Sequence, residues 1–186
     1  MIKKIFLILC IVFMLSSCSS KEKVCYPYEI KYKEVDMSGY EDINSTEHMF
    51  KGVTVQELFN VIDNKSSGVF YLGRTNCGCC QTCAKYINEA ATQENVTVYY
   101  IDVYDKVMPI DTEELMDKLK MYIYEALNEV DGEKTLQTPI VFSVINGKIS
   151  DSIVCLSDNS WDDEPTKIQE NRLLKKYKSI MKPFAK

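Results

Sequence analysis

The sequence predicts an α/β domain with a central mixed sheet of about four to five strands, flanked by helices and ending in a closing β-hairpin and a C-terminal helix. Between residues 54 and 182, helical apolar patterns alternate with short β-branched and aromatic runs in the order α-β-α-β-α-β-β-α. This alternation favours parallel strands joined by right-handed crossovers. The dipeptide Asn146-Gly147 is the strongest two-residue signal for a hairpin turn.

The first half of this order begins with a capped helix. Thr54-Val55-Gln56-Glu57 fits the capping-box pattern, and the helix that it starts ends before Gly68. A strand at about 68–73 leads into a helix at about 79–93. The β-branched and aromatic run 96–103 then predicts a second, parallel strand.

The second half begins with a helix predicted from residue 111 to about 130, where Asp131-Gly132 stops it. The strand 140–145 and its antiparallel partner 148–154 enclose the hairpin turn. A last helix starts at Glu164-Pro165.

The N-terminal sequence is typical of a secretory signal. Lys3 and Lys4 precede an apolar run over 5–15, and this run is shorter than a membrane-spanning helix requires. Leu15-Ser16-Ser17-Cys18 resembles the lipobox of bacterial lipoproteins. That resemblance implies cleavage before Cys18, lipid attachment to Cys18, and display on the extracytoplasmic face of a bacterial cell membrane. An uncleaved anchor and a plain signal peptide are the alternatives.

Three segments follow from this interpretation. Residues 1–17 are the lipoprotein signal peptide, 18–45 a tether and N-terminal extension, and 46–186 the folded domain. Polar and apolar residues alternate over 29–35, which predicts an edge strand within the extension. The formal net charge of −5, without a long basic run, argues against nucleic acid as a partner.

Cysteines gather where the first predicted strand meets its helix. Cys77, Cys79, Cys80 and Cys83 fall within seven residues. A thiol at a helix N-terminus is near free backbone N–H groups and the positive end of the helix dipole, and both favour the thiolate. A second thiol three residues on lies one turn away. The arrangement is typical of thiol–disulfide exchange.

The segment Gly73-Arg74-Thr75-Asn76-Cys77-Gly78-Cys79-Cys80-Gln81 resembles the thioredoxin superfamily. More narrowly, it resembles the thioredoxin-like bacteriocin transport accessory proteins, in which a strand ends in Gly-Arg, two residues intervene, and Cys-x-x-Cys-Gln follows. The resemblance implies a thioredoxin-like fold and selects Cys77 and Cys80 as the active pair. Spacing alone does not, because Cys80 and Cys83 also form a Cys-x-x-Cys.

The resemblance also gives a role to Thr138-Pro139, before the strand 140–145. It implies a cis peptide at this bond, with Pro139 packed at the catalytic site and Thr138 contacting substrate. The sequence departs from the family pattern in the extra Cys79 and Cys83 and at two further positions. Asn76 replaces the usual aromatic residue before the first cysteine, and Tyr71 falls where thioredoxins bury an acidic residue.

These patterns predict a membrane-anchored extracytoplasmic thiol–disulfide oxidoreductase. Cys77 would be the attacking thiolate and Cys80 the resolving thiol, with Arg74 and Lys85 adding positive potential. The expected partners are protein thiols and disulfides, together with a membrane electron donor or an export machinery. The redox-active disulfide is the only cofactor expected. An accessory role in peptide or bacteriocin export is an alternative.

The remaining cysteines leave several interpretations open. Cys79 and Cys83 are candidate auxiliary thiols that relay a disulfide or simply pack as small apolar groups. The four clustered thiols could instead hold Zn or Cu in a non-catalytic lipoprotein. Cys25 and Cys155 are candidates for a structural disulfide that ties the N-terminal segment to the domain, or are unrelated thiols.

Overall fold

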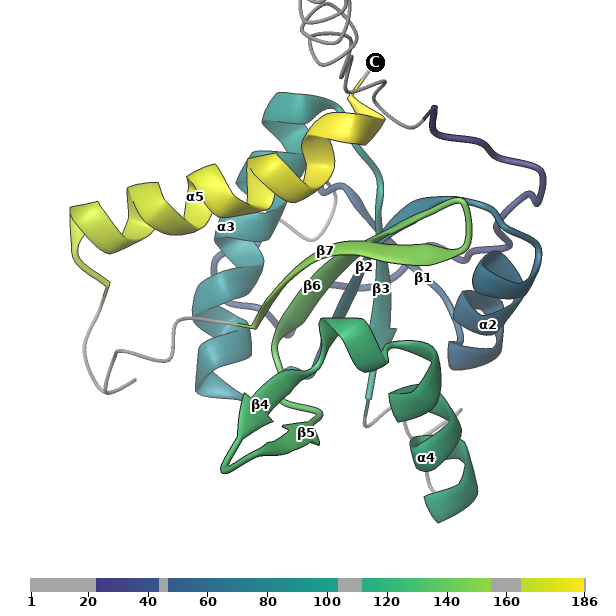
Figure 1. The fold of residues 1–186 in the computed structure, drawn as a ribbon. Coiled ribbons are helices and arrows are strands. Elements are labelled where there is room, and N and C mark those ends of the chain that lie inside the picture. The colour runs from purple at the N-terminus through teal and green to yellow at the C-terminus, as the bar shows by residue number, and fades with distance from the viewer. Residues whose placement is uncertain (1–22, 44–46, 104–111, 155–164, 186) are drawn as a thin grey trace, which may run out of the picture.

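The computed structural model describes residues 23–43, 47–103, 112–154 and 165–185. It is an α/β fold in which helices cover both faces of a five-stranded mixed sheet (Figure 1). The signal peptide and Cys18 lie outside the described residues. Among the helices in the described ranges, none is both long enough and apolar enough to cross a membrane.

The elements include the predicted alternation of helices and strands, together with three short strands, β1, β4 and β5, that were not predicted. They are β1 (Phe50–Gly52), α2 (Val55–Asp63), β2 (Gly68–Gly73), α3 (Gly78–Glu94), β3 (Val98–Asp102), α4 (Glu113–Tyr122), the 3₁₀ turn η1 (Tyr124–Ala126), β4 (Asn128–Val130), β5 (Glu133–Thr135), β6 (Ile140–Ile145), β7 (Lys148–Val154), α5 (Lys167–Met181) and the 3₁₀ turn η2 (Lys182–Phe184).

The main sheet has the strand order β1-β3-β2-β6-β7. The central strands β2 and β3 are parallel, β6 is antiparallel to β2, and β7 returns antiparallel to β6. Parallel β2 and β3 are joined through α3, as the crossover rule expects. This order, with its closing hairpin and C-terminal helix, is the thioredoxin-like fold predicted from the sequence.

Alternating side chains of the strands build two cores. Val69 and Tyr71 of β2 pack in the core under α3 and α5, whereas Phe70 and Leu72 pack in the core under α2 and α4. Figure 1 shows α3 and α5 together on one face of the sheet. Because all six residues of β2 are buried, the strand is a rigid base for the loop that follows it.

The hairpin turn has the geometry that its sequence predicts. Asn146 and Gly147 both have positive φ, at 53° and 80°. A Cβ at Gly147 would lie 2.4 Å from the carbonyl oxygen of Ile62, so the turn packs directly against the end of α2. Only glycine fits both the dihedral angle and the space.

The segment between β3 and β6 differs from the prediction. The helix expected to continue to about residue 130 ends at Tyr122, and the antiparallel strands β4 and β5 follow η1. Asp131 and Gly132 both adopt positive φ, so they form the hairpin turn between these strands instead of a helix stop. Helical periodicity alone could not detect so short a hairpin.

The edge of the main sheet also differs from the prediction. The edge next to β3 is formed by β1, whereas the predicted strand at 29–35 forms only an isolated bridge between Lys33 and Gly52. The N-terminal extension nonetheless packs on the domain, because Met37, Tyr40 and Ile43 are buried in the core under α3.

Candidate functional site

Cys77 occupies the N-cap position of α3, directly after the loop that leaves β2. Its backbone is extended, with φ −123° and ψ 115°, and its Sγ accepts a hydrogen bond from the Cys80 backbone N–H at 3.3 Å. An N-cap side chain satisfies one of the free N–H groups of the first turn. In this helix the Cys77 sulfur is the capping atom, so the N–H groups and the positive end of the helix dipole favour its thiolate form.

The surroundings of Cys77 favour its thiolate. Partial burial raises the pKa of this thiol, but hydrogen bonds from the Cys80 thiol and backbone N–H, together with the Arg74 guanidinium, outweigh burial and leave the pKa below its ordinary value. A lower pKa increases the thiolate fraction, and the thiolate is the nucleophile. The predicted attacking cysteine is therefore the activated one.

Cys80 lies one turn deeper and is completely buried. Burial raises the pKa of its thiol to about 12, and the hydrogen bond that it donates to the Cys77 sulfur acts in the same direction. Cys80 thus stays a protonated donor while Cys77 is charged. The pair is divided into one partly exposed, activated thiol and one buried, protected thiol, which is the division that a nucleophilic and a resolving cysteine require.

The segment before β6 completes this site. The Thr138–Pro139 peptide is cis, which confirms the prediction for this bond. In the thiol form, Cys77 lies 3.8 Å from the carbonyl oxygen of Thr138 and donates to it. Pro139 is buried. The fold therefore brings Thr138 next to Cys77, although the two residues are 61 positions apart in the sequence.

The two auxiliary cysteines have different environments. Cys79 is a partly exposed free thiol, and burial, with the charge of Cys77, raises its pKa to about 11. Cys83 is fully buried and disulfide-bonded, so it is not a free thiol in this structure. The four clustered sulfurs are therefore not four equivalent ligands or nucleophiles.

The predicted bond between Cys25 and Cys155 is absent from the structure, because Cys25 is a free, exposed thiol. Its backbone N–H donates to Asn146 in the hairpin turn. Strand β7 leads away from that turn, and its last residue Val154 is about 20 Å from the first. A disulfide needs Cα atoms within about 7 Å. Cys155 itself lies outside the described residues.

A metal centre finds no support in the ranges that the structure describes. Within them, no group of three or more His, Cys, Asp or Glu side chains is arranged to hold an ion. Cys83 is disulfide-bonded, so it is not available as a thiolate ligand in this structure.

Two groups of residues at this site were not expected from the sequence. Gln81 joins α3 to the extension: its amide donates to the carbonyl oxygens of Gly39 and Thr75, and it accepts from the Glu41 backbone N–H. Three buried tyrosines, Tyr40, Tyr71 and Tyr100, meet behind Cys80. Only the abundance of tyrosine pointed to the second group, and composition does not place residues.

Lys85 was expected to add positive potential at the cysteine pair, but its ammonium group is directed elsewhere. Its ammonium group forms an exposed ion pair with Asp42 at 3.3 Å and lies over the Tyr86 ring. The cation that acts on Cys77 is Arg74.

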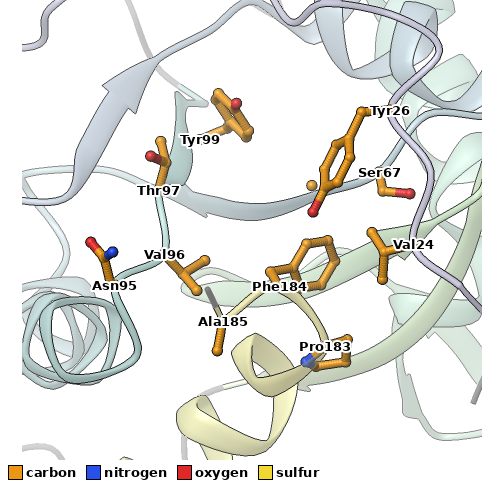
Figure 2. Close-up of a pocket in the computed structure, with 11 residues that line it drawn as sticks. Val24, Tyr26, Ser67, Asn95, Val96, Thr97, Tyr99, Pro183, Phe184 and Ala185 are labelled. Carbon is orange, nitrogen blue, oxygen red and sulfur yellow. The ribbon is translucent and has the colours of Figure 1, made fainter.

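A pocket of about 530 Å³ lies at the opposite end of the sheet from Cys77. It includes Gly68, where β2 begins, whereas Cys77 follows the end of that strand at Gly73. Figure 2 shows Val24 and Tyr26 of the N-terminal segment, Thr97 before β3, and Phe184 of η2 around it. This pocket is therefore separate from the thiol site.

No protein-family model matches the chain, and no curated protein sequence matches it. Solved structures that it resembles include oxidised thioredoxin O2 from Arabidopsis thaliana, at 19% identity and a TM-score of 0.41, over 75% of this chain and 96% of that one. Another is thioredoxin from Trypanosoma brucei brucei, at 16% identity and a TM-score of 0.43, over 75% and 99%. The thioredoxin-like fold assigned above rests on the strand order and hairpin of this chain.

Proposed function

We propose that the protein is a thiol–disulfide oxidoreductase that exchanges disulfides with secreted or cell-surface proteins through Cys77 and Cys80. The observation that carries this proposal is the capping of α3 by the Cys77 sulfur, with a lowered pKa at Cys77 and a raised one at Cys80. A buried structural thiol needs no such activation.

In the reducing direction, the Cys77 thiolate attacks one sulfur of a substrate disulfide. The substrate S–S bond breaks, its electron pair leaves with the other substrate sulfur as a thiolate, and a mixed disulfide forms on Cys77. Cys80 loses its proton to solvent and attacks the Cys77 sulfur, which releases the second substrate thiolate. The protein pair has lost two electrons and the substrate has gained two. Oxidation of a substrate dithiol is the reverse sequence.

The site of action proposed here is the extracytoplasmic face of a bacterial membrane, with an anchor at Cys18. Cys25 contacts Asn146, so the described N-terminal segment starts at the hairpin-turn end of the sheet, opposite Cys77. Figure 1 shows this segment and the C-terminus at one end and the start of α3 at the other. An anchor near residue 18 would then leave Cys77 facing away from the lipid, toward protein substrates.

The test is the Cys77→Ser variant of the full chain in detergent, assayed for reduction and formation of a disulfide in a model protein. We expect loss of activity by more than a hundredfold with an unchanged circular-dichroism spectrum, because serine keeps the cap but removes the nucleophile. Cys79→Ser is the matched control and should keep its activity. Undiminished exchange by Cys77→Ser would refute the proposal.

A further inference from the structure

Three buried tyrosine hydroxyl groups form a chain behind the resolving cysteine. The Tyr71 hydroxyl lies 3.3 Å from that of Tyr40, which lies 3.1 Å from that of Tyr100. None of the three side chains is more than 5% exposed. They come from β2, the N-terminal extension and β3, so the extension supplies the middle member of the chain.

Tyr71 is the member that meets the active-site loop. Its hydroxyl is 3.4 Å from the carbonyl oxygen of Cys80, to which it can donate. The same hydroxyl lies 2.4 Å from where a Cβ on Gly73 would be, which explains why the last residue of β2 is glycine. Tyr71 therefore packs against the end of β2 and can form a hydrogen bond to the first turn of α3.

The other end of the chain opens toward solvent. Tyr100 and Asp102 both line a pocket of about 460 Å³ beside β1. Burial, together with the nearby Tyr40 and Asp102, raises the pKa of Tyr100, so its hydroxyl stays protonated and available for hydrogen bonding. A continuous polar path thus runs from the backbone of Cys80 to this pocket.

The electrostatic surroundings of Cys80 come from several elements. Burial and Cys77 raise the pKa of the Cys80 thiol, whereas hydrogen bonds from the Arg74 backbone N–H and the Thr138 side chain lower it. Tyr71 from β2, Tyr40 from the extension and Tyr177 from α5 face it from the core. These tyrosine hydroxyl groups stay neutral, because burial raises their pKa values.

We propose that Tyr71, held by Tyr40 and Tyr100, is a positioning residue for the exchange between Cys77 and Cys80. Its hydroxyl fixes the first turn of α3 and keeps the buried space around the Cys80 sulfur polar, so that this thiol can ionise when it resolves a mixed disulfide. The inference rests on the function proposed above and makes the N-terminal extension part of the site, through Tyr40.

The step that this inference concerns is the collapse of a mixed disulfide on Cys77. The full chain, with Cys25→Ser and Cys79→Ser in every sample, is treated with dithiobis(nitrobenzoate) to place thionitrobenzoate on Cys77. Cys80 then releases thionitrobenzoate as a thiolate, and its own proton goes to solvent. Mass spectrometry of the active-site peptide follows loss of the adduct over a range of pH.

Tyr71→Phe should slow this collapse about fivefold at neutral pH, because one buried hydrogen bond is lost. The midpoint of its pH profile should rise by about 0.7 pH unit, because a fivefold change in rate corresponds to that shift in the pKa of the attacking thiol. Tyr40→Phe, which leaves the Cys80 contact in place, should move the midpoint in the same direction by less. Tyr86→Phe is the matched control, because Tyr86 is on α3 but its hydroxyl donates to Glu170.

Profiles of Tyr71→Phe and Tyr40→Phe that coincide with that of the parent chain would overturn the inference. If Tyr71→Phe does not fold, a Tyr40→Phe profile that coincides with the parent profile would by itself overturn the inference. Failure of the parent chain to collapse its adduct at any pH would instead refute the proposed exchange itself, so the two failures are distinguishable.

Discussion

Two cysteines one helical turn apart have pKa values shifted in opposite directions. Both are near the N-terminus of α3, but it is the Cys77 sulfur that accepts the capping N–H and whose pKa the Arg74 guanidinium lowers. Cys80 is fully buried and donates to Cys77. Position within the first turn, rather than the Cys-x-x-Cys spacing alone, therefore decides which thiol attacks.

Replacing Arg74 tests this electrostatic account. Arg74→Gln should raise the pKa of Cys77 and slow its alkylation by iodoacetamide about fivefold at neutral pH, a loss reduced by solvent screening because the thiol is partly exposed. Since Cys77 reacts as the thiolate, its reactivity falls as pH drops through its pKa. In the variant that fall should occur at higher pH.

Lys85→Gln is the control for this experiment. It removes the same unit of charge, but Lys85 is paired with Asp42 and does not contact Cys77. Peptide mapping after timed alkylation gives the rate at Cys77 in each chain. Equal slowing in both variants would mean that net charge, and not the Arg74 contact, sets the reactivity.

At the scale of elements, the N-terminal extension and α3 are joined by one side chain. Gln81 makes hydrogen bonds to Gly39, Glu41 and Thr75. The Thr75 methyl group lies only 2.7 Å from where a Cβ on Gly39 would be, so the extension packs closely on the loop before Cys77. The extension is therefore a structural part of the active-site end of the fold.

Gln81→Ala should lower the free energy of unfolding by about 2 kcal/mol, because three partly exposed hydrogen bonds are lost at ~0.5–1.5 kcal/mol each. Urea unfolding measures this difference, and limited proteolysis should show faster cleavage near Gly39. Gln93→Ala is the matched control on the same helix, since Gln93 bonds only to the exposed Glu89 among the described contacts. A loss no larger than that of Gln93→Ala would contradict the role given to Gln81.

The elements also show what local sequence could predict. Strands β2, β3, β6 and β7 and helices α2, α3 and α5 appear where the patterns placed them, because apolar periodicity, caps and the Asn146-Gly147 turn are local signals. The β4–β5 hairpin and edge strand β1 have only three residues per strand, too few for a period to emerge. Their position depends on pairing with distant residues.

In the whole molecule, Cys77 and the first described residues of the chain lie at opposite ends of the sheet. Cys77 follows the carboxyl end of β2, and the segment from Lys23 meets the hairpin turn at the other end. A family resemblance predicted the cis peptide at Pro139, which the structure contains, and selected Cys77 and Cys80 as the candidate pair. The sequence could not predict the tyrosine chain, because Tyr40, Tyr71 and Tyr100 meet only when three separate segments fold together.

Site-resolved thiol trapping tests whether Cys77 and Cys80 form one redox couple. The full chain is equilibrated in graded glutathione buffers, alkylated, and mapped by mass spectrometry. We expect Cys77 and Cys80 to pass from dithiol to disulfide together, as a two-electron couple with a single midpoint, while Cys79 stays a thiol. Independent oxidation of the two cysteines, or a native mass that shows a bound metal on the reduced cluster, would contradict this expectation.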